Sequence, residues 1–220
     1  MPWVAGRLSL GYRPTAMPAP RKKPKRTNDP ALTRARILDA AAQLFHRRGY
    51  AETSMQHIID AASVTSGALH HHYRTKKELG LAVIRERVAQ VVDEVWIDPV
   101  VDASDPIEGI TNAFQGISRG LRRRKIAGCP LNNLAVELAF AEPEFRKEID
   151  KIFRKWRDAL ATKISGSSIC PPGLSPSEVA TFIVASYSGA MTLAKSSQSS
   201  EPLNIALKCL AHQWAGRKAA

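Results

Sequence analysis

The sequence predicts an all-α protein, with a small N-terminal domain of short helices followed by a larger helical bundle. Three observations support this prediction. Apolar residues recur at helical spacing along most of the chain after residue 30. Several of these segments open with a helix-start signature, in which Ser, Thr or Asp precedes Glu or Gln by three residues. No segment shows an equally strong alternation of apolar and polar residues, which a half-buried strand would need.

The first two helices are predicted from spacing and capping. Apolar residues from Ile37 to Phe45 mark one face of a first helix, which should end near Gly49. Thr53 begins a capping box that Gln56 would complete, because a hydroxyl accepts from the first free amides and a side-chain amide reaches back. Residues 55–62 then carry the apolar face of a second short helix.

A tight turn at residues 63–64 separates the second helix from a third. Thr65 can cap the third helix, which is expected from Ser66 to Tyr73, and Thr75 begins another capping box that opens a fourth. Two short helices joined at a steep angle by a tight turn can place the second helix in the DNA major groove. Residues 30–78 are therefore predicted to form a three-helix DNA-binding domain with a helix-turn-helix.

The next part of the chain, residues 79–216, is predicted to be a helical bundle. Each expected helix has a start signature or an apolar stripe at helical spacing. In order, these helices are a fourth one ending near Trp96, a fifth opened by Asp105 and Glu108, a short one opened by Cys129 and Pro130, a long one from Phe145 to Ile164, one opened by Ser175 and Glu178, and a last one from Pro202 to Trp214.

The charge of the chain points to a polyanionic partner. The 220 residues carry a formal net charge of +12. Residues 1–29 hold seven basic residues and one acidic residue, and residues 30–80 hold seven and four, so most of the excess lies in and before the predicted DNA-binding domain. Lys and Arg that neutralise phosphates give the salt-sensitive part of DNA affinity. A basic surface that only keeps the protein dissolved is the alternative explanation.

The N-terminal residues 1–29 are expected to be a disordered basic tail. They are rich in Pro, Arg and Lys and lack apolar periodicity. The run Arg21–Arg26 has two interpretations: an arm that follows phosphates or enters a minor groove, or a solvated tail. Met17 offers an alternative start of the chain.

Cysteine usage fits a reducing cytoplasm. The three cysteines, Cys129, Cys170 and Cys209, are widely spaced and odd in number, which argues against a disulfide framework or a zinc motif. The triplet His70–His72 does not predict a metal site, because consecutive helical residues point in different directions. No apolar run is long enough to span a membrane, and the N-terminus lacks the apolar core of a secretory signal. We therefore expect a cytoplasmic protein that needs no metal or cofactor.

Two blocks of the N-terminal domain resemble the TetR family of transcriptional regulators. Thr33–Ala41 together with Leu44–Tyr50 is similar to the first helix of the family, and Ile58–Leu79 is similar to the rest of its DNA-binding domain. The departures from the family pattern are Ser66, where Lys is common, and His70 and His72, where Tyr is common. The resemblance implies a dimeric repressor that binds double-stranded DNA at a palindromic operator. It also implies a C-terminal bundle that binds a small-molecule inducer and forms the dimer.

Residues near the start of a recognition helix reach base edges first. Gly67 would let the backbone approach the groove, and the methyl group of Ala68 suits a thymine methyl. Ser54 lies at another helix start, where free amides suit phosphate, and the resemblance adds Lys76 as a phosphate contact. The predicted DNA-contacting residues are Thr33, Thr53, Ser54, Thr65, Ser66, Gly67, Ala68, His70, His71, Tyr73 and Lys76. Each of them is alternatively an exposed polar position without a DNA role.

Cys129 is a candidate sensor thiol. It precedes Pro130 at a predicted helix start and follows the cations Arg122–Lys125, and both features lower a thiol pKa. The block Gly128–Glu137 also resembles one found in a TetR subgroup, some members of which respond to electrophiles or oxidants. A repressor that senses redox state through Cys129 is therefore one hypothesis. A small buried residue that packs at the helix start is the alternative.

The inducer pocket implied by the resemblance should lie inside the bundle. Asn133 is polar within an apolar stretch and suits the orientation of a ligand. The candidate pocket residues are Phe114, Ile117, Leu121, Cys129, Asn133, Trp156, Tyr187 and Met191. Large residues at helical spacing are, however, more often core than pocket. The last two long helices carry small residues among large apolar ones, which suits pairing across a homodimer or packing within one chain.

Two other classes of function are less favoured. An enzyme is not expected, because the sequence has no catalytic arrangement within a recognisable motif, no Gly-rich phosphate loop and no paired carboxylates. A sequence-neutral DNA-binding protein driven by the basic tail would not need an ordered helix-turn-helix.

Overall fold

The structure is all-helical, as the sequence predicted. The computed structural model describes residues 29–121, 125–167 and 169–215, so nearly all of the predicted basic tail lies outside the described residues. The helices are α1 (Pro30–Arg48), α2 (Met55–Ala62), α3 (Ser66–His72), α4 (Lys76–Val83), α5 (Ala89–Val92), α6 (Asp98–Val101), α7 (Pro106–Leu121), α8 (Pro130–Leu138), α9 (Pro143–Ile164), α10 (Pro176–Ser197) and α11 (Glu201–Ala215). None of the helices in these ranges is long and apolar enough to cross a membrane.

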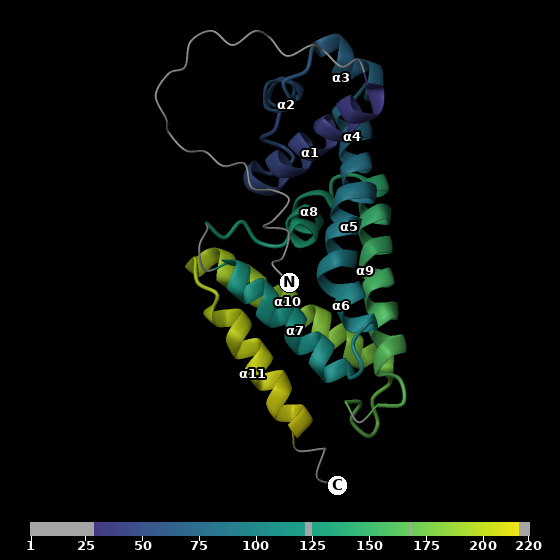
Figure 1. Cartoon of the computed structure of the whole chain (residues 1–220), viewed down its shortest axis with the longest axis vertical. Coiled ribbons are helices and arrows are strands. Elements are labelled where there is room, and N and C mark those ends of the chain that lie inside the picture. Colours follow the sequence, from purple (N-terminus) through teal and green to yellow (C-terminus); the bar gives the residue numbers. More distant parts are fainter. Residues whose placement is uncertain (1–28, 122–124, 168, 216–220) are drawn as a thin grey trace.

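A rod formed by α4, α5 and α6 connects the two ends of the molecule (Figure 1). Two π-helical segments, Ile84–Val88 and Asp93–Ile97, join these helices without leaving helical backbone angles. The sequence predicted an end near Trp96, but the rod continues to Val101, and its last turns bury Ile97 and Val100. The predicted domain boundary after residue 78 therefore falls within the first turn of a continuous rod.

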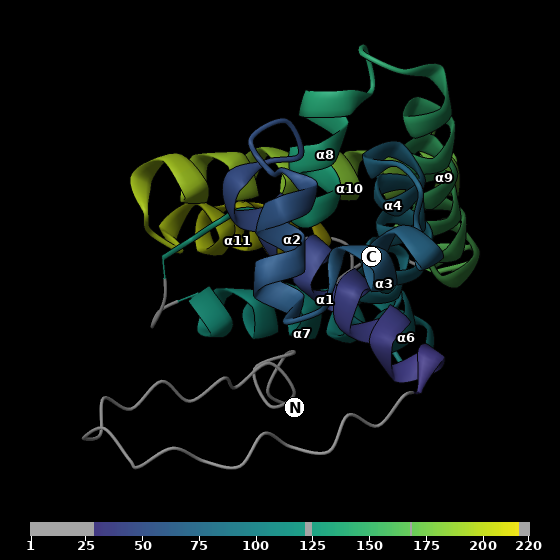
Figure 2. The ribbon, with the colours of Figure 1, turned by 90° about the horizontal axis from the view of Figure 1, so that it is seen from above.

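The helices are arranged in two groups, with α8 between them. Helices α2 and α3 pack against α1 at one end of the molecule, where Figure 2 looks down on them. Helix α9 runs beside the rod, α10 packs against α9 and α11, and α11 packs against α7. Helix α8 contacts both α1 and α9, so it lies between the N-terminal group and the bundle.

Most helix starts are capped by the residues that the sequence predicted. Thr65 Oγ1 accepts a hydrogen bond from the Ala68 amide at 3.1 Å. Ser175 and Glu178 form a complete capping box at the start of α10. At α4, Thr75 is the cap, but the Glu78 carboxylate accepts from the Arg74 amide at 2.9 Å. The Thr75 capping box is therefore only half formed.

The predicted cap of α2 is wrong by one residue. Ser54 is the cap, and its hydroxyl accepts from the His57 amide at 3.1 Å, while the Ser54 amide donates to His57 Nδ1 at 3.2 Å. Thr53 instead donates its hydroxyl to the Gly49 carbonyl at 2.7 Å and is fully buried. Gln56, expected to complete the box, bonds to Asp60 on the outside of the helix.

Candidate nucleic-acid interface

The third helix, α3, packs with one face against α1 and α2 and exposes its other face to solvent. Leu69 is fully buried under α3, where the helix meets α1 and α2. At its start, Thr65, Ser66 and Gly67 are exposed, and a Cβ atom built on Gly67 would have no neighbour within 4 Å. Nothing in the described part of the chain therefore covers the first turn of α3.

The other predicted contacts on α3 differ in exposure. Ala68 is half-buried, whereas His70 and His71 are exposed. The ring of His71 lies edge-on to that of His72, with 5.3 Å between centroids. Within the described residues no group of three His, Cys, Asp or Glu side chains is placed to hold a metal ion. The exposed imidazoles therefore stand on the outer face as hydrogen-bonding groups.

A tight turn sets the angle between α2 and α3. Ser63 adopts the left-handed conformation with φ of 51°, and the Val64 amide donates to the Ile59 carbonyl at 3.2 Å. The guanidinium of Arg36, on α1, donates to the carbonyl oxygens of Ala62 and Ser63. Arg36 could not be identified from the sequence, because its role depends on a contact with a distant turn and no local motif marks it.

Two predicted DNA contacts are buried, which corrects the prediction for them. Thr53 has no exposed surface, and Tyr73 is 6% exposed with its hydroxyl buried. The Arg34 guanidinium lies 5.7 Å from the centroid of the Tyr73 ring. Tyr73 therefore supports the base of α3, and neither residue offers its side chain to DNA. Thr33 is half-buried and donates its hydroxyl to the Asp29 carbonyl at 3.0 Å, at the start of α1.

The ammonium group of Lys76 makes contacts within the protein. Its ammonium donates to the Ala51 carbonyl at 3.1 Å and lies 4.3 Å from the centroid of the Tyr50 ring. Burial lowers the pKa of Lys76, and the carboxylates of Glu137 and Glu52 oppose this shift. In this arrangement Lys76 stabilises the loop between α1 and α2 rather than standing free for a phosphate.

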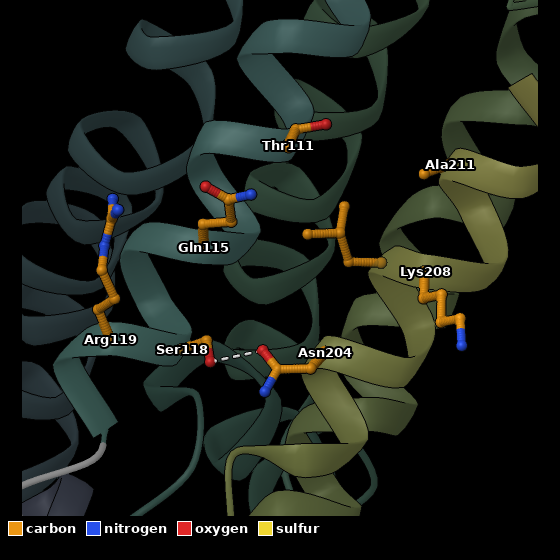
Figure 3. A pocket seen from close by; sticks show the side chains of 8 residues that line it. Thr111, Gln115, Ser118, Arg119, Asn204, Lys208 and Ala211 are labelled. Carbon is orange, nitrogen blue, oxygen red and sulfur yellow. Dashed lines mark hydrogen bonds between the residues drawn. The ribbon is translucent and has the colours of Figure 1, made fainter. Parts of the chain in front are cut away.

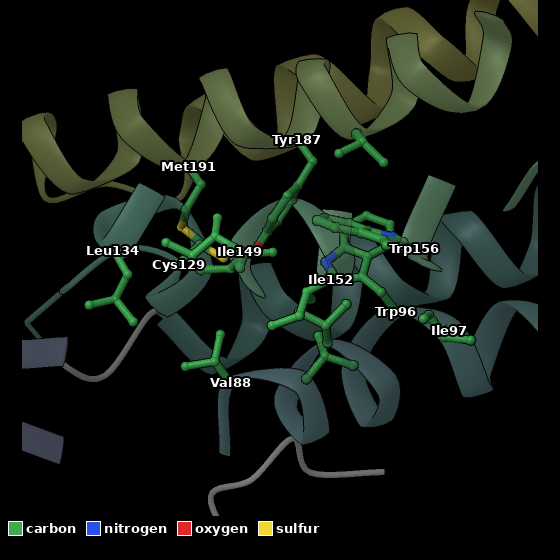
Figure 4. Close-up of a cluster of buried hydrophobic side chains, with 14 of the residues drawn as sticks. Val88, Trp96, Ile97, Cys129, Leu134, Ile149, Ile152, Trp156, Tyr187 and Met191 are labelled. Atoms are coloured by element: carbon green, nitrogen blue, oxygen red, sulfur yellow. The ribbon is translucent and has the colours of Figure 1, made fainter. Parts of the chain in front are cut away.

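Four of the predicted pocket residues, Cys129, Trp156, Tyr187 and Met191, lie together in a cluster of buried side chains (Figure 4). Trp156, Tyr187 and Phe114 are buried, and Trp96, which was not among the predicted pocket residues, packs against all three. The centroid of the Trp96 ring lies 4.6 Å from that of the Tyr187 ring and 5.0 Å from that of the Trp156 ring. Ile117, Cys129 and Met191 are also buried, while Leu121 is half-buried. Asn133 is engaged as well, since it donates to the Ala127 carbonyl and accepts from Lys195.

Two hollows lie elsewhere on the bundle. The larger, of about 490 Å³, lies between α7 and α11 (Figure 3) and is lined by Thr111, Gln115, Ser118, Arg119, Asn204, Leu207, Lys208 and Ala211. The smaller, of about 250 Å³, is lined mostly by apolar residues of α10, α11 and the segment before α10. None of the eight predicted pocket residues lines either hollow. These two hollows therefore do not coincide with the predicted pocket, whose aromatic residues pack against one another in this conformation.

Cys129 is a buried residue at the start of α8. It is 7% exposed, and burial raises the pKa of its thiol, although nearby amides of Asn132 and Leu131 and the Tyr187 hydroxyl oppose the shift. The sequence predicted a lowered pKa from a cluster of cations, of which Arg122–Arg124 lie outside the described residues and Lys125 is exposed. The expected activation of this thiol is therefore wrong for the described structure, and the alternative of a small packed residue fits it.

Comparisons with known proteins agree with this architecture. Residues 37–83 match the family model "Bacterial regulatory proteins, tetR family", and residues 106–209 match "Transcriptional regulator LmrA/YxaF-like, C-terminal domain". The chain is 28% identical over 177 residues to the HTH-type transcriptional repressor DhaR of Mycobacterium sp. (strain GP1), covering 78% of this chain and 86% of that protein. It is 26% identical over 180 residues to the HTH-type transcriptional regulator LmrA of Bacillus subtilis (strain 168), covering 81% and 94%.

A solved structure shares the fold. The crystal structure of the regulatory protein TetR from Rhodobacter sphaeroides superposes with a TM-score of 0.75 at 21% identity, covering 83% of this chain and 98% of that one. The matched family is not enzymatic, in agreement with the absence of a catalytic motif from the sequence. With its helix-turn-helix and its LmrA/YxaF-like C-terminal domain, the chain belongs to the TetR family of DNA-binding transcriptional regulators.

Proposed function

We propose that the chain is a homodimeric repressor that binds a palindromic operator through two copies of α3 and is released from it by a small-molecule inducer. The observation that carries this proposal is the uncovered first turn of α3. Ser66 and Gly67 are exposed there, while Leu69 on the same helix is fully buried. A helix held in this way can enter a major groove without rearrangement of the domain. The relative DhaR, whose name describes a repressor, supports the direction of regulation.

The exposed residues divide into base-reading and phosphate-binding groups. Ser66, Gly67 and Ala68 would face base edges, and Thr65, His70 and His71 would reach bases or the backbone. Ser54 lies at the start of α2, where unpaired amides suit a phosphate oxygen. The excess positive charge of residues 1–80 would add a sequence-independent, salt-sensitive attraction. Residues 30–78 would thus form the DNA-binding domain.

The dimer would form through α10 and α11. On their outer faces Phe182, Leu193 and Ile205 are 51%, 61% and 53% exposed, which is unusual for large apolar side chains. Ala185 and Gly189 lie between Phe182 and Leu193 on the same exposed side of α10, so another helix can approach closely. Burial of this face against a second copy would remove it from water and place the two α3 helices on the same side of a DNA duplex.

An inducer would act by opening the aromatic core of the bundle. The indole nitrogen of Trp156 is buried and has no hydrogen-bond partner in the described structure. A buried donor without a partner is costly, so a ligand that accepts from it would favour a conformation in which the core makes room. If that conformation holds the two α3 helices at a spacing that no longer fits two half-sites, the ligand shifts the population away from DNA.

The proposal is tested by selection of bound sequences from a random duplex pool at physiological salt. We expect enrichment of a palindromic motif, with half-sites separated by about one or more turns of DNA. A single half-site motif would contradict the dimer. Tight, salt-sensitive binding without any enriched sequence would contradict sequence-specific regulation and would assign the DNA affinity to the basic residues alone.

A further inference from the structure

The carboxylate of Glu137, near the end of α8, binds two backbone amides of the loop that joins α1 to α2. Its Oε2 accepts from the Tyr50 amide at 2.9 Å, and its Oε1 accepts from the Ala51 amide at 2.6 Å. Gly49, with φ of 92°, packs so closely that a Cβ atom there would lie 3.1 Å from Glu137 Oε2. One side chain of the bundle therefore satisfies both amides at a turn of the DNA-binding domain.

The same loop is enclosed by residues of three other helices. The Tyr50 ring lies 5.1 Å from the ring of Phe45 on α1 and 5.2 Å from that of Phe145 on α9, measured between centroids. Lys76, at the start of α4, lies over the Tyr50 ring and donates to the Ala51 carbonyl. Because the loop leads directly into α2, its position sets where α2 and α3 lie relative to the bundle.

The other end of α8 is connected to both α1 and α10. His46 Nε2, on α1, lies 2.8 Å from the Gly128 carbonyl oxygen just before α8. Lys195 on α10 donates to Asn133 Oδ1 at 3.0 Å, and Ser188 on α10 donates to Asn132 Oδ1 at 3.2 Å. Helix α8 thus contacts the proposed dimer helix along its first turn and the DNA-binding domain at both of its ends.

We propose that Glu137 is a positioning residue for DNA binding. Its carboxylate fixes the loop between α1 and α2 to α8, so the orientation of α3 follows α8 and, through Asn132 and Asn133, follows α10. A carboxylate can accept from both amides, and charge-assisted bonds are stronger than neutral ones. This inference rests on the proposed dimeric function, because orientation matters only when two α3 helices must match two half-sites.

The test is the variant Glu137→Gln, compared with wild type on the operator that wild type selects. A glutamine has one acceptor oxygen and would turn an NH₂ group toward an amide donor, so at least one of the two bonds is lost. Binding is measured on the full operator, on operators with one or two base pairs inserted between the half-sites, and on a duplex with a single half-site.

We expect Glu137→Gln to bind the full operator about tenfold more weakly and to bind the single half-site as wild type does. It should also discriminate less between the correct and the lengthened spacings. The matched control is Glu148→Gln on α9, which removes a carboxylate that pairs with Arg85 at 2.9 Å rather than with an amide of the loop. The control should behave as wild type on all three kinds of duplex.

Wild-type affinity and wild-type spacing discrimination in Glu137→Gln would overturn the inference. Equal losses on the full operator and the single half-site would also overturn it, because they would show damage to the reading surface itself. Failure of wild type to select a palindrome would overturn the proposed function and this role together.

Amide hydrogen exchange tests the contact without DNA. Ala51 is exposed and lies outside the helices, so its amide should exchange rapidly unless Glu137 protects it. We expect slow exchange at Tyr50 and Ala51 in wild type and faster exchange at both in Glu137→Gln. Fast exchange of these amides in wild type would overturn the inference, whether or not the variant folds.

Discussion

The guanidinium of Arg36 lies 3.0 Å from the carbonyl oxygen of Ser63, so α1 directly holds the turn of the helix-turn-helix. Arg36 also donates to the Ala62 carbonyl, the last residue of α2. The carbonyls at a helix end lack partners within the helix and carry partial negative charge, which a guanidinium can satisfy. Arg36 therefore helps to fix the angle between α2 and α3.

Replacement of Arg36 by Met keeps the aliphatic stem and removes the donors. We expect Arg36→Met to lower the free energy of unfolding by ~1 kcal/mol, since one of the lost bonds is exposed to water and the other is only partly buried. Operator affinity should fall as well, because the turn is then less well fixed. Urea unfolding measures the first effect and titration with operator DNA the second. The control Arg119→Met removes an exposed arginine on α7 and should change neither the stability nor the operator affinity. If Arg36→Met were as stable as wild type, the role of Arg36 would be contradicted.

Gly67 should show opposite effects on stability and on DNA binding. A Cβ atom at Gly67 meets nothing within 4 Å, and alanine favours a helix over glycine by about 1 kcal/mol. Gly67→Ala is therefore expected to raise the free energy of unfolding. It should also weaken operator binding severalfold, because the added methyl group keeps the helix from a close approach to the groove.

The matched control for Gly67 is Gly116→Ala on α7. A Cβ atom added at Gly116 would also meet nothing within 4 Å, and α7 lies in the bundle, far from α3 (Figure 1). It should give a similar gain in stability with no change in DNA affinity. Full operator affinity in Gly67→Ala, measured by the same titration, would show that Gly67 does not face the DNA.

The helix-turn-helix could be predicted because its signals are local. Thr65 with a free amide three residues on, and Gly49 at a helix end, are recognisable from a few neighbouring residues. The error at α2 arose because Thr53 and Ser54 are adjacent hydroxyl residues and either could cap. Only the buried contact of Thr53 with Gly49 decides between them.

The contacts between the two groups of helices could not be predicted in the same way. Glu137 and the amides of Tyr50 and Ala51 are distant in the sequence, and a backbone amide leaves no trace in the residue pattern. The same limit applies to the inducer pocket. Periodicity placed Trp156 and Tyr187 inside the bundle correctly, but whether side chains enclose a space or fill it depends on how all of them pack.

Cys129 should react slowly with thiol reagents in the folded protein. Its side chain is buried and burial raises the pKa of the thiol, so both access and the thiolate fraction are reduced. We expect maleimide labelling of Cys129 at pH 7.5 to be at least about tenfold slower in buffer than in urea. Peptide mass spectrometry separates Cys129 from the exposed Cys209. Equally fast labelling in both solvents would reopen the hypothesis that Cys129 is a sensor.

His46 should make the protein less stable in mild acid. Burial lowers the pKa of His46, while the Gly128 carbonyl opposes the shift, so the unfolded chain binds a proton more readily than the folded chain. The contribution of His46 to stability is therefore full above about pH 6.5 and declines as the pH falls toward the lowered folded value.

The variant His46→Gln tests this dependence. Its amide can still donate to Gly128 but does not titrate. We expect the fall in the free energy of unfolding between pH 7.5 and pH 5.5 to be smaller in the variant, as measured by urea unfolding at both values. A residual fall is expected from His72, whose pKa is also lowered by burial. An identical fall in wild type and variant would contradict the role of His46.

The apolar face of α10 and α11 predicts the site of dimerisation. Leu193 is 61% exposed in the single chain, and a carboxylate placed at the centre of a dry interface has no partner. Leu193→Glu should therefore shift the protein to a monomer, which light scattering after size-exclusion chromatography measures as a halved mass.

The control Val136→Glu adds the same charge at a residue that is 89% exposed on α8 and should leave the mass unchanged. A Leu193→Glu monomer should bind the full palindrome no more tightly than a single half-site, because the domain that carries α3 still folds but a second copy no longer binds with it. A mass that stays dimeric in Leu193→Glu would place the interface elsewhere on the bundle.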